Sequence, residues 1–179
     1  MNHNNSNPTD EMVDFYVRRT NEHISRVRVC LLLLAPQVDF AEELIARSEV
    51  HDASKFGDEE RIPYIWLTEF HRCRRSGTSF RYPPGMQFQV DEAIAHHMRS
   101  NRHHPEFHAD PNDMTMVDLT EMVCDWTAMA LEFGQEDGSA RSWADRTIGS
   151  RVHFNKDNEA FVYATIAKLE LLLCSRSDS

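Results

Sequence analysis

The adjacent pair His51-Asp52 is the feature of the sequence most suggestive of chemistry. Imidazole nitrogens and carboxylate oxygens both ligate metals, and at the end of a helix two neighbouring side chains can turn toward one centre. His23 follows the spacing of an apolar helical stripe, and Asp125 lies among apolar residues of another helical segment. A buried carboxylate is costly unless a positive charge compensates it. We therefore expect these four side chains to share a cation.

A second group of histidines lies in the segment 96–107, HHMRSNRHHPEF. His97 falls on the inward face of its helix, and His103 or His104 follows six or seven residues later. Together they would hold a second metal, bridged to the first through Asp52. Both a one-metal and a two-metal site stay open, with two metals favoured and His104 taken as the ligand.

The donor set is made of nitrogen and oxygen atoms, which suits Fe, Mn, Co or Ni better than a thiolate zinc site. The four cysteines are scattered and contain no CxxC pair that would compete for the metal. Beside the second histidine group, Asn101, Arg102 and His103 are expected to line a substrate pocket.

These side chains are expected to be positioned by helices, because apolar residues recur at three- and four-residue spacing and no alternating strand pattern of useful length is present. The chain is predicted to be all-α, a bundle of five or six main helices around the metal site. The expected helices are one of about 25 residues from Asp10, one from Pro36 into the His-Asp pair, and further helices over 58–72, 87–100, 114–133 and 158–174, with a short helix near Trp143 and a loop over 74–86.

The length of 179 residues suits one domain, expected over residues 9–179 after a disordered segment 1–8. The formal net charge of −10 disfavours nucleic acids and anionic membranes as partners, but it does not oppose a small phosphorylated substrate held by a metal. The longest apolar run, residues 29–36, is too short to span a membrane, so a cytoplasmic protein is expected. The last helix packs either on the core, which is favoured, or on a second subunit in a homodimer.

The ordered set formed by His23, His51-Asp52, a later histidine pair and Asp125 resembles the HD superfamily of metal-dependent phosphohydrolases. The segment HDASKF also matches the H-D-x-x-K form of several branches of that superfamily. The resemblance covers residues 10–134. More closely, HDASKF, HHMRSNRHHPEF and EMVCDW resemble an HD family of bacteria and phages that carries no assigned activity.

The resemblance implies hydrolysis of a phosphoester, from a nucleotide or a small phosphorylated metabolite, by water that the metal activates. Asp52 and Lys55 are the implied catalytic residues, and Lys55 would also contact the anionic group of the substrate. Single-metal HD nucleotidases often carry a glutamate at the position of Lys55, so their catalytic assignment does not transfer. Two alternatives remain: a diiron oxygenase of the same fold, and a protein that binds nucleotides as a sensor without turnover.

Overall fold

The computed structural model describes residues 7–133 and 139–177. In these residues the chain forms seven α-helices, four short 3-10 helices and no β-strand, so the all-α prediction is confirmed. The eight-residue helix Ala140–Thr147 is the short helix expected near Trp143, and the other six α-helices agree with the five or six main helices expected. Of the segment 1–8 expected to be disordered, residues 1–6 lie outside the described residues.

The chain divides into two compact units. Of the described residues, the first unit comprises 7–22 and 52–101, and the second comprises 23–51, 102–133 and 139–177. One boundary falls inside α1 (Asp10–Leu34), between Glu22 and His23, and another falls at the His51-Asp52 peptide bond. The single domain expected over residues 9–179 stays a prediction.

The first unit is built around a pair of packed helices, α3 (Arg61–Ser76) and α4 (Met86–Ser100), which follow η2 (Ala53–Phe56). The amino-terminal part of α1 adds its inward side chains to the same unit. Its core consists of six buried side chains: Met12, Tyr16, Ile65, Trp66, Met86 and Val90. Each apolar side chain of this size stabilises the fold by about 1.5–3 kcal/mol on burial.

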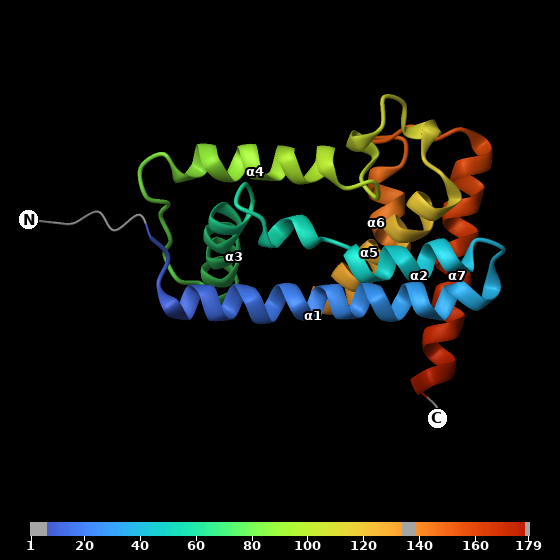
Figure 1. The fold of residues 1–179 in the computed structure, drawn as a ribbon, viewed down its shortest axis with the longest axis horizontal. Coiled ribbons are helices and arrows are strands. Elements are labelled where there is room, and N and C mark those ends of the chain that lie inside the picture. The colour runs from blue at the N-terminus through green and yellow to red at the C-terminus, as the bar shows by residue number, and fades with distance from the viewer. Residues whose placement is uncertain (1–6, 134–138, 178–179) are drawn as a thin grey trace, which may run out of the picture. The chain divides into compact units, whose positions relative to one another are not determined.

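The second unit is organised around α5 (Met116–Phe133), which packs against α2, α6 and α7 (Figure 1). Its remaining elements are the part of α1 from His23 on, η1 (Ala35–Gln37), α2 (Ala41–Val50), η3 (Pro105–Phe107), η4 (Pro111–Asp113), α6 (Ala140–Thr147) and α7 (Lys156–Ser177). The last helix, α7, buries Val162, Ile166 and Leu169 completely in this core. The expectation that the last helix packs on the core is therefore confirmed.

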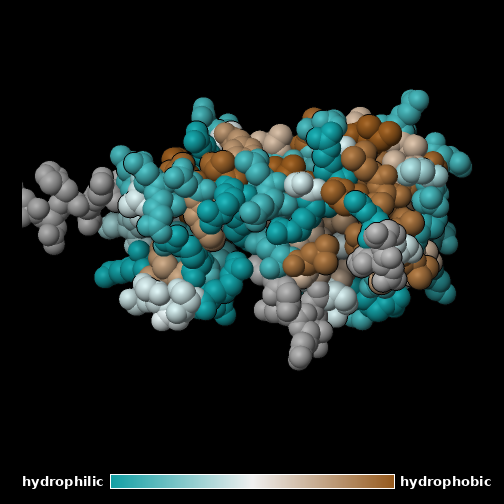
Figure 2. Space-filling model, turned by 90° about the horizontal axis from the view of Figure 1, so that it is seen from below, coloured by the Kyte–Doolittle hydropathy of each residue, from teal (hydrophilic) through white to brown (hydrophobic). Residues whose placement is uncertain are grey.

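The surface carries some apolar side chains among polar ones, as the brown and teal areas of Figure 2 show for one face. Leu171, at 71% exposure, is the most exposed of the large apolar residues described. Among the described residues, none of the helices combines the length and the apolar character that a membrane crossing demands. The four cysteines are free thiols.

Candidate metal centre

The His-Asp pair lies directly after a helix end, as expected. Helix α2 ends at Val50, and His51 leaves the helical conformation with ψ 128°. Asp52 has φ 57°, the one positive φ among the described residues other than glycine. Aspartate tolerates this left-handed conformation better than most residues. Both side chains are buried, so this turn directs them inward at the end of the helix.

In the second unit, three of the predicted ligands converge. Oδ1 of Asp125 lies 3.0 Å from Nε2 of His23 and 3.7 Å from Nε2 of His51. Each of the three residues offers one ligand atom, and these atoms lie within 4.8 Å of one another. Both histidines are buried, whereas the side chain of Asp125 retains 17% of its exposure.

In the first unit, three further predicted site residues lie together. Oδ1 of Asp52 is 3.3 Å from Nε2 of His97, and its Oδ2 accepts a 2.5 Å hydrogen bond from Nζ of Lys55. The Lys55 ammonium also lies over the ring of Tyr64, 5.7 Å from its centroid. Tyr16 donates a 2.6 Å hydrogen bond from its hydroxyl to the backbone carbonyl of Lys55, which anchors this turn.

Two buried glutamates complete these clusters, and the sequence analysis did not identify either of them. In the second unit, Oε1 of Glu121 lies 2.8 Å from Nδ1 of His51 and 3.5 Å from Nδ1 of His103, while Nε of Arg47 donates to Oε2 at 2.6 Å. Burial alone would raise the pKa of Glu121, but hydrogen bonds from His103 and His51 outweigh burial and hold that pKa far below its usual range.

In the first unit, Glu60 is fully buried and accepts hydrogen bonds from Nδ1 of His96 at 2.8 Å and from Nδ1 of His97 at 2.9 Å. Burial would raise the pKa of Glu60, but the hydrogen bonds from His97 and His96 lower it below its ordinary value. Around metal sites, a carboxylate commonly accepts a hydrogen bond from the ring nitrogen of a ligand histidine that does not bind the metal.

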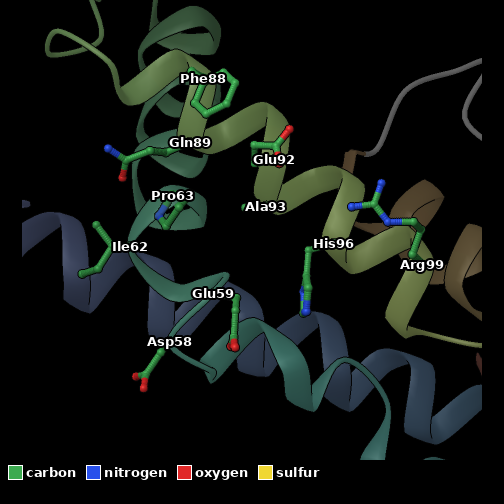
Figure 3. Close-up of a pocket in the computed structure, with 10 residues that line it drawn as sticks. All are labelled: Asp58, Glu59, Ile62, Pro63, Phe88, Gln89, Glu92, Ala93, His96 and Arg99. Carbon is green, nitrogen blue, oxygen red and sulfur yellow. The ribbon is translucent and has the colours of Figure 1, made fainter.

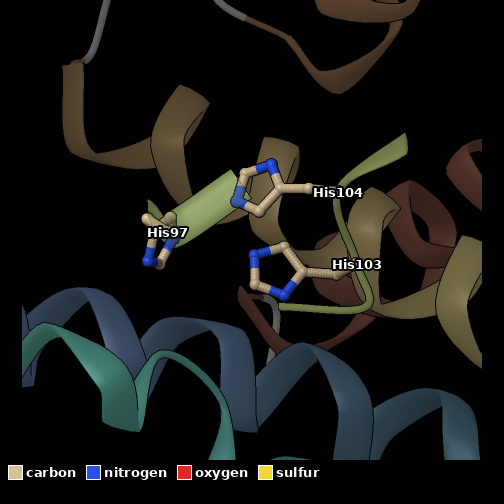
Figure 4. Close-up of side chains that lie close together, drawn as sticks. All are labelled: His97, His103 and His104. Atoms are coloured by element: carbon tan, nitrogen blue, oxygen red, sulfur yellow. The ribbon is translucent and has the colours of Figure 1, made fainter. Parts of the chain in front are cut away.

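The two histidines that follow α4, His103 and His104, differ in their burial. His103 is 2% exposed, and its ring centroid lies 4.6 Å from that of His51. The neighbouring ring of His104, beside that of His103 in Figure 4, has its centroid 4.3 Å away and is only half-buried. His51, His103 and Glu121 offer ligand atoms within 4.8 Å of one another. His103 therefore lies among these ligand atoms, and His104, the expected ligand, also offers a ligand atom within 4.8 Å of one on His103, so its role stays a prediction.

The residues expected to contact substrate already have protein partners. Arg102 donates to both oxygens of Asp118, at 3.0 and 2.9 Å, and is 44% exposed. Asn101 donates to Oγ of Ser54 and to the carbonyl of His97, each at 2.9 Å. Their roles toward a substrate stay predictions.

A pocket of about 580 Å³ lies in the first unit between α4 and the start of α3 (Figure 3). Its wall carries acidic, basic and apolar side chains: Asp58, Glu59, Ile62, Pro63, Phe88, Gln89, Glu92, Ala93, His96 and Arg99. None of the residues expected to bind substrate lines it. One wall residue, His96, shares Glu60 with His97, so the pocket adjoins the buried cluster of this unit.

The donor chemistry fits a divalent cation. Burial would raise the pKa of Asp125, but hydrogen bonds from His23 and His51 hold it well below its usual range. Burial would lower the pKa of His97, but the carboxylates of Asp52 and Glu60 raise it. Each cluster therefore stabilises positive charge, and a cation with nitrogen and oxygen ligands supplies that charge without any thiolate.

The fold and these clusters define an all-helical protein with buried histidine–carboxylate groups suited to a divalent metal. The chain belongs to the Family of unknown function (DUF5662), whose model matches residues 12–168. No curated protein and no solved structure matches the chain.

Proposed function

We propose that the protein is a metal-dependent hydrolase that cleaves a phosphoester in a nucleotide or another small phosphorylated metabolite. The observation that carries the proposal is the convergence of His23, His51 and Asp125 on a group of ligand atoms within 4.8 Å. This nitrogen- and oxygen-rich set matches the HD-type resemblance of the sequence and suits Fe, Mn, Co or Ni.

In this proposal His23, His51 and Asp125 hold the cation, and Asp52 directly follows one of these ligands in the chain. When bound, such a cation acts as a Lewis acid that polarises a phosphoryl oxygen and makes water a better nucleophile. Burial of the two histidines keeps bulk water from competing for the ligand atoms.

Lys55 is proposed to offset the negative charge of the substrate. Its ammonium already lies 2.5 Å from Asp52 Oδ2, and the side chain is 18% exposed, so it is held beside Asp52 while keeping access to solvent. A charged donor of this kind strengthens hydrogen bonds to phosphate oxygens. Asn101, Arg102 and His103 are proposed to contact the rest of the substrate.

The test begins with elemental analysis of the purified protein, followed by a screen for phosphate release from phosphorylated metabolites with Mn²⁺, Co²⁺ and Ni²⁺. The informative variant is Asp52→Asn, because asparagine also adopts the positive φ of this position and has nearly the size of aspartate, while it lacks the charge and one acceptor oxygen. We expect phosphate release to fall at least about 100-fold while helix content is unchanged.

The matched control is Asp58→Asn, which removes an exposed carboxylate from the same turn region. It should retain activity. Full metal occupancy and full activity in Asp52→Asn would contradict the proposed role of the His-Asp pair.

A diiron oxygenase is a second candidate, favoured by the number of buried histidines: His23, His51, His97 and His103 are all at most 5% exposed. Nitrogen-rich iron sites suit redox chemistry. Two tightly held irons with a mixed-valence electron paramagnetic resonance signal, and no phosphate release, would favour the oxygenase. Binding of a nucleotide that stabilises the protein without any product would favour a sensor.

A further inference from the structure

Glu60 stands between two histidine rings that have different environments. Its Oε1 accepts from Nδ1 of His96, whose side chain is 40% exposed at the wall of the pocket. Its Oε2 accepts from Nδ1 of His97, whose side chain is buried. An ionised carboxylate has no proton to donate. Both Nδ1 atoms must therefore carry the hydrogen in these bonds.

This requirement determines the other nitrogen of His97. A neutral imidazole carries one proton, so a ring protonated at Nδ1 has a free lone pair at Nε2. In the structure Nε2 of His97 lies 3.3 Å from Oδ1 of Asp52, which is also an acceptor. Two acceptors facing each other repel unless positive charge lies between them. A proton on Nε2 supplies that charge by making the ring an imidazolium, and a divalent cation bound by both atoms supplies it in place of that proton.

The other groups near Nδ1 of His97 do not determine its proton. Nδ2 of Asn101 lies 3.1 Å away, but it donates to Ser54 Oγ and to the backbone carbonyl of His97. The hydroxyl of Ser54, at 3.3 Å, can either donate or accept. Glu60 is thus the group whose chemistry permits one tautomer only.

The backbone holds Glu60 in this place. It lies in a turn where the N–H groups of Glu60 and Arg61 both donate to the carbonyl of Gly57, at 3.3 and 2.9 Å. The carbonyl of Glu60 accepts the first bond of α3, from Tyr64 at 2.9 Å. The ring of Tyr64 meets that of His97 edge-on, with centroids 5.6 Å apart.

We propose that Glu60 is a positioning residue for a metal ligand: it fixes His97 in the Nδ1-protonated form, so that Nε2, beside Asp52, is presented to a divalent cation. The proposal rests on the metal-dependent function proposed above and extends it to a residue that does not touch the metal. Carboxylates that hold ligand histidines in this way typically contribute 10- to 100-fold to metal affinity.

The test compares Glu60→Gln with Glu59→Gln, in which the neighbouring exposed glutamate is changed. A glutamine has one acceptor oxygen, so it cannot accept from both rings as Glu60 does. Mn²⁺ affinity is measured by competition with a chelating dye, and circular dichroism checks the helix content. We expect Glu60→Gln to bind Mn²⁺ about 10- to 100-fold more weakly than wild type, and Glu59→Gln to bind it unchanged.

A second measurement does not depend on whether the variant folds. In wild-type protein labelled with ¹⁵N at histidine and loaded with ¹¹³Cd²⁺, His97 should show metal coupling at Nε2 and a proton at Nδ1. Coupling at Nδ1, no coupling at either ring nitrogen, or equal Mn²⁺ affinity in Glu60→Gln and wild type would overturn the proposal. Glu60-dependent metal binding without phosphate release would instead support the role of Glu60 and contradict the hydrolase.

Discussion

Glu60 in the first unit and Glu121 in the second perform the same task in different electrostatic surroundings. Each is almost completely buried, and each carboxylate meets two histidine rings through their Nδ1 atoms. The difference is an arginine: Arg47 donates to Glu121 and also to Asp118. Each oxygen of Glu60 accepts instead from Nδ1 of one histidine, Oε1 from His96 and Oε2 from His97.

The comparison shows two ways of keeping a buried carboxylate ionised. Glu121 belongs to a network with a permanent positive charge, because a guanidinium is protonated at every physiological pH. Glu60 depends on imidazoles, whose hydrogen bonds must compensate the cost of burial. The network around Glu121 is expected to contribute mainly to folding stability. Glu60 is expected mainly to determine which ring nitrogen of its histidines carries the proton.

The largest effect is expected for Glu121→Ala. The change leaves the buried part of Arg47 and the rings of His51 and His103 without their common acceptor, and breaking such a buried network costs about 3 kcal/mol or more. Urea denaturation followed by circular dichroism measures the loss in free energy of unfolding. The exposed Glu170 on α7 provides the control, and Glu170→Ala should change stability by less than about 0.5 kcal/mol. A loss below 1 kcal/mol in Glu121→Ala would mean that the network is not the stabilising element proposed.

The next effect is expected for Asp118→Asn. Asp118 accepts from both Nε and Nη2 of Arg102 and from the backbone N–H and hydroxyl of Thr115. Burial alone would raise its pKa, but the hydrogen bonds from Arg102 and Thr115 lower it below its ordinary value. A carboxylate with a lowered folded-state pKa stabilises the fold above its unfolded pKa, about 3.9, and loses that contribution as pH falls through the folded value.

Asp118→Asn should therefore cost about 2 kcal/mol at pH 7 and progressively less below pH 4, where the carboxyl of the unfolded wild type takes up a proton before that of the folded state. Urea midpoints measured between pH 7 and pH 3 test this prediction. A difference between variant and wild type that stays constant over the whole range would show that the charge of Asp118 is not involved.

The helices were predictable because apolar spacing reports them directly. The helix expected from Asp10 for about 25 residues is α1. The predicted helix ends were less accurate, because turn geometry determines where a helix begins and ends. Helix α3 begins at Arg61 rather than 58 and continues to Ser76, because Gly77, with φ 70°, provides the left-handed residue that ends it. The proline-led helix expected from 36 is a short 3-10 turn, and α2 begins only at Ala41.

The candidate metal ligands on helices were predictable, and the glutamates beside them were not recognised. Glu121 precedes Asp125 by one helical turn, so its position on the same face was available from the sequence. Glu60 gave no such signal, and the sequence left open which residue of the pair His103-His104 is a ligand, because these residues lie in turns where no periodicity shows which side chains are buried. The burial of Glu60 and His103 follows from tertiary packing.

The smallest effect is expected for His96→Gln, and it sharpens the comparison between the two glutamates. The side chain of His96 is 40% exposed, so water can replace much of the hydrogen bonding that its ring provides to Glu60. The loss in free energy of unfolding should therefore be about 0.5 kcal/mol. The same change at His103, which is 2% exposed beside Glu121, should cost several times more, because an amide there cannot fill the space of the ring. Urea denaturation of both variants gives the ratio. Equal losses at the two positions would show that the exposed ring stabilises Glu60 as strongly as the buried ring stabilises Glu121. The distinction between a carboxylate stabilised by imidazoles and one stabilised by an arginine would then be wrong.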